Sequence, residues 1–404
     1  MSDWRTYKLG ELVEKITKGT TPSTLGGGFV DNGINFIKSE SVTYDGTIDK
    51  SKFAYINKET HENLKRSQLQ KDDILFSMAG IFLGKNAIVT EDILPANTNQ
   101  ALAIIRLKKD ITSVKYIHYY LRQADVVKKI NSISGQSAQP NINFEEIKSI
   151  EIKVPDFKTQ KEIASILSSL DDKIELNRQM NQTLEAMAQA IFKKWFVLPN
   201  TEGGLPDGWR MEKISNLGTV VTGNTPSSNN PEHFGSKTPF VTPSDFKNYG
   251  KLIIDSERFL SDEGVKALSK RLLPVNSVIV TCIGSDMGKV AINKVECVTN
   301  QQINSIIPQK DLITVDYLYY DLVNKYEYLK NLSTGGSTMP IINKTRFEQI
   351  EILVPTFDVV SKFQNLIDSF NNRIEDNIIQ NKTLTQIRDS LLPKLMTGKI
   401  TIER

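Results

Sequence analysis

Few side chains of this 404-residue chain could assemble a catalytic or metal centre. It contains three histidines (His61, His118 and His233) and two cysteines (Cys282 and Cys297). These numbers exclude a disulfide framework, a zinc site of four cysteines and almost any histidine-rich metal centre. The histidines are scattered along the chain, and no clustering of serine, histidine and aspartate supports acyl transfer. We therefore expect no catalytic residue and no metal ligand.

Motifs that bind nucleotide cofactors are also missing from the sequence. The glycines at 26–28 follow no apolar strand, and the chain has no Walker A pattern and no Pro-Pro pair, which an adenine methyltransferase needs in its active-site turn. Segments 146–148 and 151–153 have the Glu-x-Lys spacing of a metal-dependent nuclease, but the second half of the chain does not repeat it. A solvated strand face explains this spacing better, so we expect no cofactor bound to this chain.

The composition predicts a folded protein with nearly balanced charge. Hydrophobic residues make up 39% and charged residues 24%, and 50 Lys and Arg against 47 Asp and Glu give a net charge of +3. No apolar run reaches the ~18 residues of a membrane span, and the start of the chain lacks an apolar signal segment, so we expect a cytoplasmic location. With so small a net charge, any contact with nucleic acid must use local patches or a partner that shares the electrostatics.

The chain repeats itself with an offset of 200 to 205 residues. The clearest pairs are Trp4-Arg5 with Trp209-Arg210, Thr21-Pro22-Ser23 with Thr225-Pro226-Ser227, and Asn99-Gln100 with Asn300-Gln301. Between residues 131–196 and 331–396, 20 of 66 positions are identical. A period this long is not that of a solenoid unit. It indicates a duplicated domain with pseudo-two-fold symmetry.

Both halves follow one plan, which predicts an α+β fold of two pseudo-repeated globular domains, each followed by a long helix. The expected boundaries are 1–155, 156–198, 199–355 and 356–404. Short strands are expected at 35–37, 73–76, 87–89 and 101–107, and one helix at 114–129 with a counterpart at 315–329.

The two long segments carry a coiled-coil heptad. From Thr159 to Phe196 no Gly or Pro occurs, and an apolar seam continues over about five heptads. The seam of the second segment includes Phe363 and Leu395, and we expect Pro393 to interrupt that helix near its end.

Each seam carries two asparagines near its middle: Asn177 and Asn181 in the first, Asn377 and Asn381 in the second. A buried asparagine is costly alone but tolerable opposite another, and such a pair fixes register. Because these positions are central, an antiparallel pair of helices would bring all four together. The alternative is two separately packed helices whose asparagines face solvent.

These features together resemble the specificity subunits of Type I restriction–modification systems, and the resemblance covers essentially the whole chain. Besides the duplicated plan, it rests on Gly19-Thr20-Thr21-Pro22-Ser23, Lys71-Asp72-Asp73-Ile74-Leu75 with Gly84-Lys85, Asn99-Gln100, Ile191-Phe192-Lys193-Lys194-Trp195-Phe196 and Leu391-Leu392-Pro393-Lys394-Leu395-Met396-Thr397-Gly398-Lys399-Ile400. The family's helix-leading Pro-x-x-x-Glu-Gln-x-x-Ile pattern survives as Pro155, Thr159-Gln160 and Ile163. In the second half it has become Pro355, Val359-Val360 and Phe363.

The resemblance implies a subunit without catalytic activity. Each globular half would be a target recognition domain that reads one half of a bipartite sequence in double-stranded DNA. Two long antiparallel coiled-coil helices would separate the domains, set their spacing and dock two modification (methyltransferase) subunits. The resemblance also implies that S-adenosylmethionine, ATP and Mg are bound by the modification and restriction (helicase-nuclease) subunits and not by this chain.

Small polar residues and lysines in the repeated loops are the candidate DNA-binding residues. They are Thr20, Thr21, Ser23, Lys85, Gly135, Gln136, Ser137 and Gln139 in the first half, and Thr225, Ser227, Ser228, Lys289, Gly335, Gly336, Ser337 and Thr338 in the second. Plain turns and solvated lysines are the alternative. We expect structural hydrogen bonds from the Asn-Gln pairs, core positions for Tyr116, Tyr119 and Tyr120, and packing roles for Trp4 and Trp209.

Two other classes of protein stay open on the sequence alone. A coiled-coil scaffold without DNA function would not bind random duplexes. An autonomous methyltransferase or nuclease would show activity as a pure chain.

Overall fold

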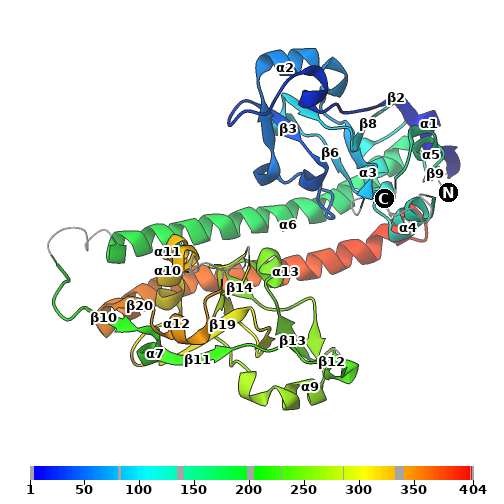
Figure 1. The fold of residues 1–404 in the computed structure, drawn as a ribbon. Helices are drawn as coiled ribbons and strands as arrows, with labels where there is room; N and C mark the ends of the chain where they lie inside the picture. The colour runs from blue at the N-terminus through cyan, green and yellow to red at the C-terminus, as the bar shows by residue number, and fades with distance from the viewer. Residues whose placement is uncertain are drawn as a thin grey trace. The chain divides into compact units, whose positions relative to one another are not determined.

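The computed structural model describes residues 4–80, 83–133, 141–197, 204–227, 229–284, 286–332, 341–400 and 402. It divides into two compact units, Met1–Ile174 with Lys382–Arg404 and Glu175–Asn381. Each unit contains one globular part and a segment of each long helix (Figure 1). No helix among the described residues is long and apolar enough to cross a membrane.

The globular part of the first unit is built on three small sheets. Their strand orders are β1-β9, β2-β8-β5-β6 and β4-β3-β7. The strands are β1 (Arg5–Lys8), β2 (Val13–Lys18), β3 (Ile34–Ile37), β4 (Ala54–Ile56), β5 (Ile74–Ser77), β6 (Asn86–Ile88), β7 (Ala96–Thr98), β8 (Leu102–Leu107) and β9 (Glu151–Val154). The central strands β5 and β8 are nearly continuous apolar runs because both of their faces are covered. The four strands predicted from the sequence are confirmed to within one residue at each end.

The second unit repeats this arrangement with an added strand in each larger sheet. Its strand orders are β10-β20, β11-β19-β16-β17-β14 and β12-β15-β13-β18. The strands are β10 (Arg210–Lys213), β11 (Gly218–Thr222), β12 (Phe234–Gly235), β13 (Thr238–Val241), β14 (Leu252–Ile253), β15 (Phe259–Leu260), β16 (Val278–Thr281), β17 (Val290–Asn293), β18 (Val298–Thr299), β19 (Ile303–Pro308) and β20 (Glu351–Val354).

Short helices cover these sheets. In the first unit they are α1 (Leu9–Leu12), α2 (Lys58–Asn63), α3 (Val114–Leu121), α4 (Ala124–Ile133) and α5 (Phe144–Lys148). In the second unit they are α7 (Ile214–Leu217), α8 (Asp245–Tyr249), α9 (Asp262–Ala267), α10 (Val315–Asn324), α11 (Tyr326–Leu332) and α12 (Lys344–Glu348). The tyrosines of α3 are buried, and Trp4 and Trp209 each pack on the core of their own unit, as the sequence predicted.

The prediction of one continuous helix at 114–129, and of its counterpart at 315–329, is wrong. In the first unit α3 ends at Leu121 and α4 starts at Ala124, while in the second unit α10 and α11 are divided at Lys325. At each break a cation turns to a carboxylate: Arg122 lies 3.2 Å from Asp171, and Lys325 lies 2.7 Å from Asp321. Only the first of these is a tertiary contact, since Lys325 and Asp321 are four residues apart in the chain. Packing on the core of each unit overrides the helical periodicity, which does not reveal it.

The two long helices start at equivalent residues. Helix α6 spans Phe157–Phe192 and continues as a π-helical turn, Lys193–Val197, while α13 spans Phe357–Met396. The buried side chain of Gln160 donates to the carbonyl of Pro155 at 3.0 Å, whereas its counterpart Val360 is buried in the apolar core. The changed leader sequence of the second half therefore does not displace the start of its helix.

Pro393 does not interrupt α13, contrary to the expectation from sequence. The helix continues through this proline to Met396. The neighbouring Leu392, Leu395 and Met396 are buried in the core of the first unit. Burial of these three side chains offsets the cost of the missing backbone hydrogen bond, so the helix persists for another turn.

The heptad prediction is confirmed, since every seam residue of both helices is buried or half-buried. Within the second unit the four asparagines meet across an antiparallel pair. Asn177 Nδ2 donates to Asn381 Oδ1 at 2.8 Å and to Gln380 Oε1 at 2.7 Å. Asn377 Nδ2 donates to Asn181 Oδ1 at 2.7 Å. Among the four asparagines each helix supplies one donor and one acceptor, so these two hydrogen bonds repeat the pseudo-two-fold symmetry of the sequence.

A buried charge network ties the globular part of the first unit to its helices. Asp171 of α6 accepts a hydrogen bond from Tyr119 Oη of α3 at 2.6 Å and pairs with Arg122 at 3.2 Å. Arg388 of α13 occupies a seam position, is only 7% exposed, and lies 2.6 Å from the same carboxylate. The network joins three helices at one aspartate.

The second unit has a different network in the corresponding place. Lys251 is buried and its ammonium lies 2.7 Å from Asp316 and 2.8 Å from Tyr320 Oη. It also donates to Asn371 of α13 at 2.7 Å. Burial alone would raise the pKa of Asp316, but Lys251, Gln364 and Asn371 together hold it below its usual value. Asn371 in turn donates to Asp316 at 2.8 Å. The globular part is therefore joined to α13 by hydrogen bonds from one asparagine to both members of a buried ion pair.

We predict that Asn177→Ala destabilises the second unit by about 1 kcal/mol, because the half-buried Asn381 and the exposed Gln380 lose the donor that the buried Asn177 supplies. The matched control is Asn372→Ala on the exposed face of the paired helix α13, which should change stability by less than about 0.5 kcal/mol and in the favourable direction. Urea unfolding measures both. Equal effects of the two substitutions would show that the buried asparagine layer does not stabilise this unit.

We also predict that the first unit loses stability as the pH falls from 7.5 to 5.5. Burial, with smaller effects from Arg122 and Lys115, places the pKa of His118 well below its usual value of 6.5. The folded unit therefore cannot take up the proton that the unfolded chain binds below about pH 6.5, and each pH unit below that costs up to about 1.4 kcal/mol. Denaturation followed by Trp4 fluorescence in a Trp195→Phe, Trp209→Phe background should show this loss, and His118→Gln should remove it. The same loss in the His118→Gln chain would assign it to other groups.

Candidate nucleic-acid interface

Two sequence motifs of the first unit meet where β2 ends. The hydroxyl of Thr21 donates to the side-chain carbonyl of Gln100, and the amide of Thr20 donates to the carbonyl of Thr98 at 3.0 Å. Gly19 is required in this approach, since a Cβ there would lie 2.1 Å from the carbonyl oxygen of Thr98. We refer to the contact between threonine and glutamine as the Thr–Gln junction.

The second unit builds the same Thr–Gln junction after β11. Thr225 Oγ1 donates to Gln301 Oε1 at 2.5 Å, and the amide of Asn224 donates to the carbonyl of Thr299 at 2.9 Å. A Cβ on Gly223 would lie 2.3 Å from that carbonyl. The duplicated motifs therefore specify one local structure, made twice from segments about 80 residues apart in the chain.

Each Thr–Gln junction presents an oriented amide to solvent. Gln100 and Gln301 are exposed, and the threonine hydroxyl fixes the side-chain carbonyl, which leaves the amide Nε2 without a partner among the described residues. A glutamine amide can bind the edge of adenine in the major groove. Sequence reasoning assigned structural hydrogen bonds to the Asn-Gln pairs. That role falls to Asn99 Oδ1, which accepts from the amide of Ala101.

Three further candidates that the structure describes, Thr20, Ser23 and Ser227, lie next to the junctions in the chain. Thr20 Oγ1 accepts a hydrogen bond from Arg66 at 3.1 Å, and Ser227 Oγ accepts from the amide of Asn229 at 3.2 Å. Ser23 is exposed in the turn that follows the first junction. Candidates Gly135, Gln136, Ser137, Gln139, Ser228, Gly335, Gly336, Ser337 and Thr338 lie outside the described residues.

The two repeated lysines have unlike surroundings. Lys85 lies 3.4 Å above the ring of Tyr44, and burial, with a smaller effect from Lys52, lowers its pKa. Lys289 is paired with Asp286 at 2.6 Å. A phosphate at Lys289 would have to compete with that carboxylate, so the structure favours Lys289 less than the exposed junction residues.

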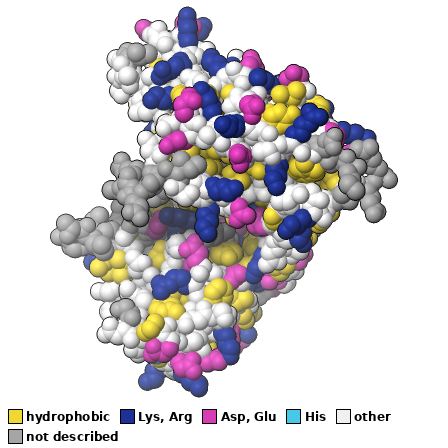
Figure 2. Space-filling view, turned by 90° about the vertical axis from the view of Figure 1, so that its right-hand side faces the viewer, with side chains coloured by type: hydrophobic (Ala, Val, Ile, Leu, Met, Phe, Trp, Pro, Cys, Tyr) yellow, Lys and Arg dark blue, Asp and Glu magenta, His cyan; other side chains and the backbone are white. Residues whose placement is uncertain are grey.

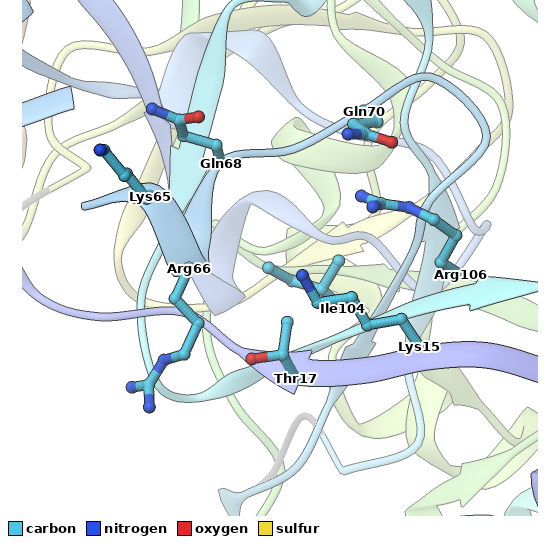
Figure 3. Close-up of a pocket in the computed structure, with 8 residues that line it drawn as sticks. All are labelled: Lys15, Thr17, Lys65, Arg66, Gln68, Gln70, Ile104 and Arg106. Carbon is cyan, nitrogen blue, oxygen red and sulfur yellow. The ribbon is translucent and has the colours of Figure 1, made fainter. Parts of the chain in front are cut away.

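A basic hollow beside the first Thr–Gln junction was not predicted from the sequence. Figure 3 shows its lining, which comes from β2, β8, the 3₁₀ turn Lys65–Ser67 and the segment 68–70 that follows it. The lining residues are Lys15, Thr17, Lys65, Arg66, Gln68, Gln70, Ile104 and Arg106. Lys15 lies opposite Arg106 in the β2–β8 register, a pairing between residues 91 positions apart that a single sequence does not display. Arg66 joins the hollow to the junction through its hydrogen bond to Thr20.

No extended surface of one charge faces the viewer in Figure 2, where lysine and arginine side chains alternate with aspartate and glutamate. The small net charge of the chain agrees with this mixture. On this face positive charge is therefore gathered only locally.

The two cysteines are buried, and Glu146 of the Glu-x-Lys segment caps a helix. Burial raises the pKa of both Cys282 and Cys297 to about 12, so both thiols stay protonated at neutral pH. Glu146 caps α5 by accepting from the amide of Asn143 at 2.8 Å. Among the described residues, no three His, Cys, Asp or Glu side chains are grouped so as to hold a metal ion.

Two duplicated α+β domains, each with an exposed polar junction and a segment of a paired long helix, define a class of proteins that present two related recognition surfaces. The family model of the Type I restriction modification DNA specificity domain matches residues 1–186 and 206–387. The chain therefore belongs to the specificity subunits of Type I restriction–modification systems and carries two DNA recognition domains.

Similar proteins agree with this membership. The Type I restriction enzyme HindI specificity subunit of Haemophilus influenzae is 29% identical over 476 residues, covering 99% of this chain and 100% of that protein. The MjaIX specificity subunit of Methanocaldococcus jannaschii is 26% identical over 420 residues, covering 99% and 94%. The fold resembles the crystal structure of a Type I restriction–modification S subunit from M. genitalium, with a TM-score of 0.60 at 15% identity over 98% of this chain and 96% of that one.

Proposed function

We propose that this chain reads the DNA target of a Type I restriction–modification complex and catalyses no step itself. The observation that carries the proposal is one Thr–Gln junction built twice, within domains whose surrounding side chains differ. A shared backbone frame holds each domain on DNA in the same way, while different side chains at the base edges read different sequences. Each domain accordingly reads one half of a bipartite target.

In this proposal the long helices set the spacing of the half-sites. A helix of 36 residues is about 54 Å long at 1.5 Å per residue. Half-sites read from one face of DNA lie roughly 34–36 Å apart, a distance that such a helix can span.

The helices also dock two modification subunits, following the internal two-fold symmetry of the chain. Exposed apolar side chains on them, among them Leu176, Met187 and Ile387, provide surface for that contact. The modification subunits bind S-adenosylmethionine and transfer the methyl group. Restriction subunits bind ATP and Mg. The assembly acts in the cytoplasm, and that location stays a prediction.

The first test separates this function from an autonomous enzyme. The purified chain, given S-adenosylmethionine and duplex DNA, should transfer no methyl group. With its modification subunit it should form a complex of two such subunits to one chain that methylates DNA. Native mass spectrometry and a methyl-transfer assay measure both results. Methylation by the isolated chain, or one modification subunit per chain at saturation, would contradict the proposal.

The second test concerns the division of the target. Replacing residues 1–155 with the matching domain of a related specificity subunit should change one half of the methylated sequence and leave the other half intact. Methylome sequencing of cells that carry the chimera provides the readout, and the unmodified chain is the control. A change in both halves would mean that the domains do not read independently.

A further inference from the structure

The basic hollow gathers four cations in one concave surface of the first unit: Lys15, Lys65, Arg66 and Arg106. Arg106 is neutralised by a bidentate contact at 2.8 Å with the buried carboxylate of Asp73. Lys15 and Lys65 are exposed and have no carboxylate partner among the described residues. Cations held close together in a hollow repel one another and attract anions from solution.

The second unit supplies an internal comparison, because its backbone repeats the frame of the hollow. Lys15 opposite Arg106 corresponds to Thr219 opposite Ile307. The loop before β5 has a positive φ at Asp72, and the corresponding loop before β16 has one at Asn276. The same sheet and loop therefore form whether or not the cations are present.

The side chains at the matching positions of the second unit are mostly uncharged. Thr219, Ser269 and Ile307 replace Lys15, Lys65 and Arg106, and Lys270 stands in the place of Arg66. Arg271, in the place of Ser67, adds a second cation, but it is half-buried and donates to the carbonyl of Thr222 at 2.9 Å. The fold does not need the four cations. The exposed lysines Lys15 and Lys65 occur in the first copy alone and point to a ligand of that copy.

We infer that the basic hollow binds the phosphodiester backbone of DNA beside the first half-site, and that the second recognition domain, which lacks counterparts of Lys15 and Lys65, binds phosphate more weakly at the matching place. This inference rests on the proposed function and adds to it the residues that contact phosphate and the difference between the two recognition domains. Arg66 touches both the hollow and Thr20, whose neighbour Thr21 orients Gln100. A strand whose base reaches the amide of Gln100 thus has its phosphates beside Lys15, Lys65 and Arg66, which position the strand without reading its sequence.

The test measures binding of the full chain to a random-sequence duplex as a function of salt. The variant Lys15→Gln, Lys65→Gln, Arg66→Gln should flatten the dependence of log affinity on log salt by about 1 to 2 units, since each phosphate contact contributes about 0.9. Affinity should fall by about 10-fold at 100 mM salt. The reverse variant, Thr219→Lys with Ser269→Lys, should steepen the dependence.

A charge-matched control removes three lysines outside the hollow, through Lys58→Gln, Lys71→Gln and Lys109→Gln. Each of these already pairs with a carboxylate, at 3.9, 4.0 and 2.7 Å respectively. We expect this control to change the salt dependence by less than half as much as the hollow variant. The substituted side chains are exposed, so we expect all variants to fold. Thermal unfolding checks this.

The outcomes separate this inference from the proposed function. Equal salt dependence for the hollow variant and the control would overturn the inference and leave the proposed function in place. An altered methylated sequence for the hollow variant, in complex with its modification subunit, would also overturn it, because phosphate contacts do not specify bases. Failure of the unmodified chain to bind DNA, alone and with its modification subunit, would overturn both.

Discussion

The antiparallel register of the two long helices is the constraint on which the rest of the structure depends. In the second unit Asn177 lies opposite Asn381 and Asn377 opposite Asn181. A slip of one heptad would place Asn177 opposite Ile374, and each buried amide left without a partner costs about 1–3 kcal/mol. In the first unit a slip of one heptad in the other direction would remove Arg388 from Asp171 and put Leu395 opposite that carboxylate. Polar residues in an apolar seam thus select one register from several that the apolar residues alone would accept.

The register in turn fixes where each recognition domain is held. In the first unit Asp171 belongs to the helix pair and also binds Tyr119 and Arg122 of the globular part. In the second unit Asn371 belongs to the pair and accepts from Lys251. Breaking a buried charge pair costs about 3–5 kcal/mol. Because these networks differ between the units, each domain matches its own segment of the helices. On the other segment the first domain would lose Asp171 as the partner of Arg122, and the Lys251–Asp316 pair would lose its hydrogen bonds to Asn371.

Much of this architecture could be predicted from the sequence because the relevant signals are periodic or repeated. The heptad identified both long helices, and the four asparagines indicated that they pair. The repeated Thr-Pro-Ser and Asn-Gln motifs marked the residues of each junction, although not that they touch. The basic hollow was missed because Lys15, Lys65 and Arg106 come from three separate segments. Pro393 was misjudged for a similar reason, since its tolerance depends on the burial of Leu392 and Leu395 in a core built largely from the other end of the chain.

A near-neutral net charge suits a protein that must find one sequence among many. Cations spread over the whole surface would strengthen binding to every duplex equally, and the competing sites of a genome would then hold most of the protein. Cations without carboxylate partners that are gathered in one hollow position a strand without adding much to binding elsewhere. The junctions divide the work further, because Gly19 and Gly223 fix the backbone by close approach to a strand while the outward side chains are free to differ. Change in those side chains alters the sequence that is read, and the helix register and both cores stay as they are.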